Sequence, residues 1–177
     1  MAYASLERFR DITGRNVLAL QQAKEAGKKV VGQYCIYSPL EIALAAGAIP
    51  VSLCGTKNDS IPVAETMLPR SLCPLIKSSF GFALQDSCPY LAASDIVVAD
   101  TTCDGKKKMY ELLAAYKPVV LLQLPQIQDG DAKTTGAPST PSSPRAGKDF
   151  GASITTDDLR DAVRLTNRLR RASKDVP

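Results

Sequence analysis

Histidine is absent from the sequence, and its absence removes several kinds of active site. Histidine is the usual general base near neutral pH and the partner of serine or cysteine in most nucleophilic pairs. It is also a common metal ligand, so any metal bound by this chain is expected to rest on other donors. Tryptophan is absent too, and aromatic residues make up only 6% of the chain. Few side chains can stack on bases, so we expect no nucleic-acid partner.

Long apolar runs are also lacking. No stretch approaches the roughly 18 apolar residues that span a bilayer, so we expect no membrane segment. Residues 1–8 mix acidic and basic side chains without the apolar core of a secretory signal, which favours a cytoplasmic location. The 177 residues are 45% apolar, as expected of one globular domain. Much of the net charge of +4 lies near the C-terminus, and we interpret it as the solvated face of a terminal helix.

Cysteine is the residue type that remains for chemistry. The five cysteines are Cys35, Cys54, Cys73, Cys88 and Cys103. An odd number in a chain expected to be cytoplasmic argues against disulfides, so they are core residues, reactive thiols or metal ligands. Without histidine, a metal site here would rest on thiolates, which favour iron–sulfur clusters and zinc.

Short apolar runs alternate with helical patterns along the first two thirds of the chain. The expected strands cover residues 29–35, 49–53, 95–99 and 118–124, and the expected helices cover 5–26, 39–46, pieces of 62–86, and 104–116. This alternation predicts an α/β fold, a three-layer Rossmann-like domain with a mostly parallel sheet flanked by helices. The last two strands each contain a continuous apolar run, so we expect both to be buried on both faces.

The composition divides the chain into four segments. They are an N-terminal helix (1–27), an α/β domain (28–125), a flexible linker (126–152) and a C-terminal helix (153–177). The linker is expected to be disordered because residues 129–149 contain no large apolar side chain. The terminal helix is expected to start with an N-cap and an acidic first turn near Thr155, and to have one apolar face.

Two cysteines are predicted to lie at helix starts. Cys103 follows an apolar strand and precedes a helix, and Cys73 precedes Pro74, which favours the first helical position. Ligands of open α/β sheets bind beyond the carboxyl ends of the strands, and a helix N-terminus there favours a thiolate or an anionic cluster. Cys73 and Cys103 could therefore share one metal centre. The alternative for Cys103 is a small residue in a tight turn.

The other candidates rank lower. Cys88 precedes Pro89, is expected in a loop, and is a reserve ligand. Cys35 and Cys54 end strands and are interpreted as core cysteines. The lysines of 106–108 are interpreted as a wet helix face, and nothing distinguishes Asp100 from a surface or capping carboxylate. The motifs GxGxxG, GxxxxGK[ST] and GxSxG are absent, so nicotinamide enzymes, P-loop NTPases and α/β-hydrolases lose support.

Four stretches together resemble a known family. They are YCIYSPLEI (34–42), AAGAIPV (45–51), LPRSLCP (68–74) and DTTCDGKKK (100–108). With them the chain resembles the D-component family of 2-hydroxyacyl-CoA dehydratases, and within it the double-cubane cluster proteins. The resemblance runs over residues 5–125 and returns at 153–171, and the motifs around Cys73 and Cys103 are the most specific.

The resemblance implies a cofactor and partners. It implies an oxygen-sensitive iron–sulfur cluster, [4Fe–4S] or double-cubane [8Fe–9S], for which Cys73 and Cys103 match the first two of three cysteine ligands in each subunit. It further implies an ATP-dependent activator iron–sulfur protein, a second dehydratase subunit or homodimer mate, and an acyl-CoA substrate. The implied reaction is a one-electron reduction that allows a 2-hydroxyacyl-CoA to lose its hydroxyl as a ketyl radical, a lyase reaction.

The chain also departs from this family. Family members are about twice as long, and a second α/β domain supplies their third cysteine, so we expect an incomplete fragment that is inactive alone. Where the family has an amphipathic helix, this chain has segment 129–149, which we attribute to a shift of reading frame. The alternatives are a double-cubane reductase of small molecules and a cluster-free α/β fragment with only a binding role; a structural zinc site is more distant.

Overall fold

The computed structural model describes residues 2–35, 37–124 and 153–175. Its four strands are β1 (Val30–Tyr34), β2 (Ile49–Ser52), β3 (Ile96–Asp100) and β4 (Val119–Leu122). Its helices are α1 (Ala2–Glu25), α2 (Leu40–Ala45), α3 (Ile61–Ala64), α4 (Pro74–Leu84), α5 (Pro89–Ala93), α6 (Asp104–Leu113) and α9 (Thr156–Lys174). The predicted linker, the predicted disorder of 129–149 and the reading-frame hypothesis fall mainly on residues outside this description.

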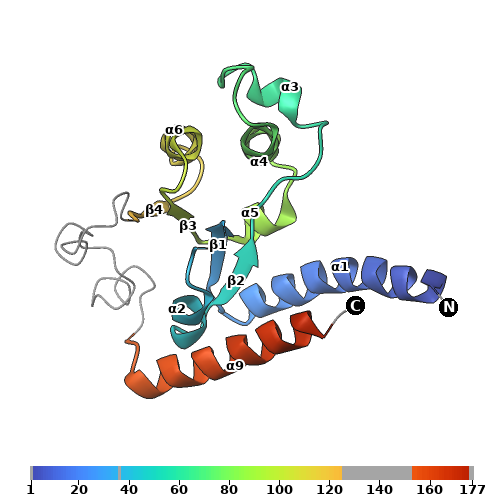
Figure 1. Ribbon diagram of the computed structural model, residues 1–177, viewed down its shortest axis with the longest axis vertical. Coiled ribbons are helices and arrows are strands. Elements are labelled where there is room, and N and C mark those ends of the chain that lie inside the picture. Colours follow the sequence, from blue (N-terminus) through green and yellow to red (C-terminus); the bar gives the residue numbers. More distant parts are fainter. Residues whose placement is uncertain (1, 36, 125–152, 176–177) are drawn as a thin grey trace.

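The strands form one parallel sheet in the order β2-β1-β3-β4. Helices α2 and α9 lie on one side of the sheet, and α4 and α6 lie side by side on the other (Figure 1). The α/β class, the parallel sheet and the flanking helices are confirmed. The two sides follow from right-handed crossovers, because the chain moves from β1 to β2 in one direction and then returns past β1 to β3 and β4.

The core is divided between the two faces of the sheet. Val97 and Ala99 of β3 point to the larger cluster, with Phe80 of α4 and Met109 of α6. Val98, between them, points to the smaller cluster against α2. This alternation along β3 is the period of a strand, and burial of both sets confirms the prediction that β3 is covered on both faces.

The strand β4 differs from its prediction. It is half-buried, and Leu121 is 41% exposed. Its sequence is as apolar as that of β3, but β4 lies at the end of the sheet and pairs only with β3. At the opposite edge, β2 contains Pro50, which a central strand would tolerate poorly. The amides of Ile49 and Leu53 donate to the carbonyl oxygens of Lys29, just before β1, and of Gln33 in β1. The nitrogen of Pro50 therefore faces the open edge, and no ladder bond is lost.

Most helix boundaries follow the local signals. Pro39 precedes α2, and Gly47 follows it with a positive φ of 72°, a conformation that glycine adopts without a Cβ penalty. Thr155 caps α9, as predicted. The sequence interpretation missed α5, which has only five residues and is too short to show a helical period.

The terminal helix α9 packs on α2 through a polar contact. Both Thr166 and Arg170 donate to Oε1 of Glu41, over 2.8 and 2.5 Å. Burial alone would raise the pKa of the Glu41 carboxyl, but these hydrogen bonds, with one from its own backbone, lower it. The predicted apolar face is covered only in part: Ala162 and Thr166 are buried, whereas the larger apolar side chains remain exposed. The arginines along the rest of α9 are exposed, which confirms the expected solvated face.

Candidate functional site

The strand order places a topological switch point between β1 and β3. The chain leaves β1 toward α2 on one face and leaves β3 toward α6 on the other, so the two connections diverge at the carboxyl ends of these strands. Open α/β sheets bind ligands at such a point. Cys35 directly follows β1, and the turn 101–103 directly follows β3. The sequence-predicted residue Cys103 therefore lies where the topology favours a ligand.

Cys103 is the N-cap residue of α6. Its backbone is extended, with φ −142° and ψ 130°, and its thiol makes no capping hydrogen bond. The residue is exposed. A cysteine in this place presents its sulfur to solvent beside free amide groups of the helix N-terminus, which stabilise negative charge.

Cys73 is placed in the same way at the start of α4. It is an exposed N-cap residue without a side-chain capping bond, and Pro74 occupies the first turn. The loop before it is held by Lys77, whose ammonium is 2.7 Å from Oε1 of Glu65 and 2.8 Å from the carbonyl oxygen of Arg70. The placement of both cysteines at helix starts is confirmed, whereas their role as ligands stays a prediction.

The starts of α4 and α6 are in contact. A Cβ added to Gly105 would come within 2.7 Å of Cδ1 of Leu72 and 3.1 Å of Cδ1 of Ile76. Leu72 precedes Cys73, and Gly105 follows Cys103 by two residues. The glycine thus allows the two helix starts to approach closely, and it brings the segments that carry the two cysteines to one end of the α4–α6 layer.

Cys88 is not in a loop as predicted but is the N-cap residue of α5. Its sulfur accepts the Leu91 amide at 3.5 Å. It lines a cavity of about 360 Å³ with Cys54 and Tyr34, and neither Cys73 nor Cys103 lines that cavity. Burial raises the pKa of the Tyr34 hydroxyl, and the two cysteines raise it further. As a reserve ligand Cys88 thus has a competing structural role.

The interpretation of Cys35 and Cys54 as core cysteines is wrong. Cys54 is exposed and Cys35 is half-buried. Cys35 has a φ of +73°, a left-handed conformation that is uncommon for a residue with a Cβ and that costs free energy. Its thiol lowers the pKa of Asp100 and raises the pKa of Lys106. Sequence reasoning missed Cys35 as a site neighbour; its position directly after β1 was the signal that could have found it.

Asp100 and Lys106 were also misread from the sequence. Asp100 is fully buried and forms an ion pair of 3.0 Å with Lys106, whose side chain is 15% exposed. Burial would raise the pKa of Asp100, but hydrogen bonds from Thr102 and Lys106 lower it. The other lysines of the run, Lys107 and Lys108, pair with exposed carboxylates, as expected of a wet helix face.

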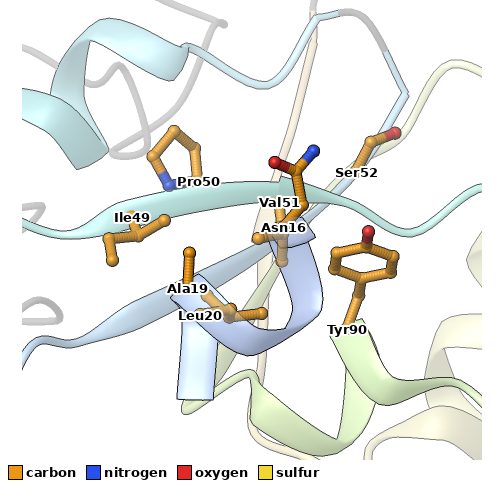
Figure 2. A pocket seen from close by; sticks show the side chains of 8 residues that line it. All are labelled: Asn16, Ala19, Leu20, Ile49, Pro50, Val51, Ser52 and Tyr90. Carbon is orange, nitrogen blue, oxygen red and sulfur yellow. The ribbon is translucent and has the colours of Figure 1, made fainter. Parts of the chain in front are cut away.

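A second hollow lies away from these helix starts. It has a volume of about 520 Å³ and is formed by α1, β2 and Tyr90 of α5, as Figure 2 shows. The Tyr90 hydroxyl, Asn16 and Ser52 are its polar groups, and the rest of the lining is aliphatic. None of the five cysteines lines this hollow, so it contains no thiol that could bind a metal or react.

The donor set at the helix starts fits an iron–sulfur cluster in kind but is incomplete. Thiolates are the ligands that such clusters take. Within the described parts of the chain, however, no three histidine, cysteine, aspartate or glutamate side chains gather so as to hold a metal ion. Cys73 and Cys103 could therefore supply two ligands of a larger set. In the same residues, no helix combines the length and apolar character that crossing a bilayer requires.

Comparison with known proteins identifies the family. Residues 35–176 match the family described as 2-hydroxyglutaryl-CoA dehydratase, D-component. The chain belongs to this family. The resemblance inferred from the cysteine motifs is thereby confirmed.

Curated relatives of this dehydratase family include YjiM of Escherichia coli K12, a provisionally named dehydratase subunit. It is 47% identical over 96% of this chain and 45% of its own length. The (R)-2-hydroxyglutaryl-CoA dehydratase subunit beta of Acidaminococcus fermentans is 24% identical over 97% of this chain and 46% of its own. The lactoyl-CoA dehydratase subunit beta of Anaerotignum propionicum is 29% identical over 70% and 32%. The chain thus spans less than half the length of these relatives.

Proposed function

We propose that this chain is the part of a 2-hydroxyacyl-CoA dehydratase subunit that contributes Cys73 and Cys103 to an iron–sulfur cluster. When bound, such a cluster supplies low-potential electrons for removal of the 2-hydroxyl group. The observation that carries the proposal is the pair of exposed cysteines at the N-termini of two helices in contact, neither engaged as a cap. Family membership and the thiolate preference of such clusters support it.

In this proposal, the chain's own residues bind the cluster and orient its two thiolate ligands. The amide groups at the starts of α4 and α6 stabilise the negative charge of a thiolate-bound centre. The close approach at Gly105 sets the spacing between the two segments. The remaining ligands would come from outside the described residues or from a partner chain.

The substrate and partners belong to the same proposal. Two of the relatives are named as the beta subunits of (R)-2-hydroxyglutaryl-CoA dehydratase and lactoyl-CoA dehydratase. We therefore infer a 2-hydroxyacyl-CoA substrate, a second dehydratase subunit and an ATP-dependent activator for the protein to which this segment corresponds. A location in the cytoplasm is part of the inference.

A cluster-free α/β segment is the second candidate. The absence of a three-donor group among the described residues favours it. A double-cubane reductase would differ in the nuclearity of the cluster, and no residue described here favours it over the dehydratase.

The deciding experiment is iron and acid-labile sulfide per chain after anaerobic purification. We expect about four of each per chain. A double cubane shared by two chains would give about the same iron per chain, so this measurement tests for a cluster and not for its nuclearity. Circular dichroism on the same sample establishes whether the chain is folded. Absence of iron and sulfide in a folded chain would contradict cluster binding by this segment and favour the second candidate.

A further inference from the structure

The turn that carries Cys103 is tied to one buried carboxylate oxygen. Oδ1 of Asp100, the last residue of β3, accepts the Thr102 amide at 3.2 Å, the Thr102 hydroxyl at 2.5 Å and the Lys106 ammonium at 3.0 Å. Thr102 directly precedes Cys103, and Lys106 follows it by three residues. The carboxylate therefore holds the chain on both sides of the cysteine.

Lys106 closes this arrangement into a ring of contacts. Its ammonium also donates to Oγ1 of Thr102 at 2.8 Å. Burial would lower the pKa of Lys106, but Asp100 and the Cys35 thiol raise it, so the pair is charged. The neighbouring Lys107 has the same side chain, and its ammonium contacts an exposed carboxylate of its own helix at 3.0 Å.

The residue that follows β1 is electrostatically coupled to the same pair. The Cys35 thiol lowers the pKa of Asp100 and raises the pKa of Lys106, and Cys35 has the uncommon φ of +73°. The other oxygen of Asp100, Oδ2, is buried and has no hydrogen-bond partner among the described residues. A strained residue and an unpaired buried oxygen both cost free energy, and such costs concentrate at functional positions.

Asp100 and Lys106 also lie beside a cysteine that, as a metal ligand, would need neighbouring contacts to fix its position. The Cys103 thiol makes no capping bond, so the side chain of the cysteine does not help to fix its own turn. Metal ligands that are not fixed by neighbouring contacts bind weakly. A buried ion pair is often no more stabilising than packed apolar residues, so stability gives little reason to keep this one.

We propose that Asp100 and Lys106 are positioning residues that hold the sulfur of Cys103 in place relative to Cys73. The identity of the bound group rests on the proposed function, whereas the positioning itself concerns only this chain. Neither residue is a ligand in this proposal.

The test uses the full chain and a variant that removes both charges at once. Asp100→Asn with Lys106→Met leaves the net charge unchanged and leaves no unpaired buried charge. Lys107→Met is the matched control on the same helix, and Lys106→Arg is the conservative variant that keeps the ion pair. Circular dichroism shows which variants are folded.

Two measurements separate positioning from the identity of the ligand. In metal-free chain, we expect the ratio of maleimide labelling rates of Cys103 and Cys73, measured by peptide mass spectrometry, to change several-fold in the double variant only. In anaerobically loaded chain, we expect its affinity for iron to fall about tenfold or more, as for other residues that orient metal ligands. Lys106→Arg and Lys107→Met should keep both wild-type values.

Each outcome decides one of the two proposals. A folded double variant with wild-type labelling ratio and wild-type iron affinity overturns the positioning role. A wild-type chain that binds no iron contradicts the proposed function, and the labelling ratio then decides the positioning alone. If the double variant does not fold, Thr102→Val removes the two hydroxyl contacts with Asp100 and Lys106 at an exposed position. An unchanged labelling ratio in that variant is the contradicting result.

Discussion

The helices α6 and α9 begin in opposite ways. At α9, the Thr155 hydroxyl accepts the Asp158 amide at 3.2 Å, and Oδ2 of Asp158 accepts the Thr155 amide at 3.0 Å, which completes a capping box. At α6, the N-cap is Cys103, and its thiol accepts nothing. The N-cap side chain of α9 accepts a free amide of its helix, whereas the N-cap side chain of α6 makes no such bond and remains available.

We interpret this difference as one between a structural helix start and the helix starts of the proposed cluster site. The start of α4 resembles that of α6, because Cys73 also makes no capping bond. The start of α5 lies between the two kinds, since the Cys88 sulfur accepts the Leu91 amide at 3.5 Å. Cysteine is a poor N-cap compared with serine, threonine or aspartate. Its presence at two neighbouring helix starts therefore points to chemistry rather than to helix stability.

The largest expected effect separates the free thiols from the engaged one. Cys73→Ser and Cys103→Ser should each reduce bound iron to background, because a hydroxyl is a poor ligand for the cluster. Cys88→Ser is the matched control, since its side chain is engaged in α5, and it should retain wild-type iron. Iron and sulfide per chain after anaerobic purification measure this. Loss of iron in all three variants would remove the distinction between the two kinds of helix start.

The next effect concerns the helix start that we interpret as purely structural. Thr155→Ala should lower the free energy of unfolding by about 1 kcal/mol, because the Asp158 amide loses its acceptor. Thr155→Ser keeps the acceptor and should remain close to wild type. Urea unfolding followed by circular dichroism measures both. Bound iron should be the same in both variants, and a change in iron would contradict the purely structural role of this start.

The sequence anticipated most of these starts for physical reasons that act locally. Pro74 marks the first turn of α4, and the acidic residues after Thr155 mark α9. The run before Cys103 has the apolar character of a strand buried on both faces. The sequence therefore predicts that the turn after it lies at the carboxyl end of a central strand.

What the sequence could not reveal depends on tertiary neighbours. The edge position of β4 follows from the strand order and not from its apolar composition. The left-handed backbone of Cys35 and the ion pair between Asp100 and Lys106 arise only when β1, β3 and α6 meet. A lysine run looks the same in sequence whether its first member is buried or solvated, and Lys106 differs from Lys107 only in what lies beside it.

When no metal is present, replacing the Cys103 thiol should have a smaller effect on stability, opposite in sign to that of Thr155→Ala. In metal-free chain, Cys103→Ser should raise the free energy of unfolding by a few tenths of a kcal/mol to about 1 kcal/mol, because serine supplies the missing cap. The same variant loses iron, so stability and ligation should change in opposite directions. Cys103→Ala lacks the cap and serves as the control. A serine variant less stable than the alanine variant would show that the thiol already supports the helix.

The smallest effect concerns the acid limb of the stability curve. Hydrogen bonds from the Thr155 hydroxyl and amide lower the pKa of the Asp158 carboxyl below its ordinary value of 3.8. A group with a lowered native pKa stabilises the fold above its unfolded value, and this contribution is lost as the pH falls through the native value. Asp158→Asn should therefore flatten the loss of α9 helicity below about pH 4 and change little at neutral pH. Asp157→Asn, at a neighbouring exposed position outside the capping box, is the control. Equal acid responses of the two variants, followed by circular dichroism, would mean that the box is not closed in solution and that α9 begins no more tightly than α6.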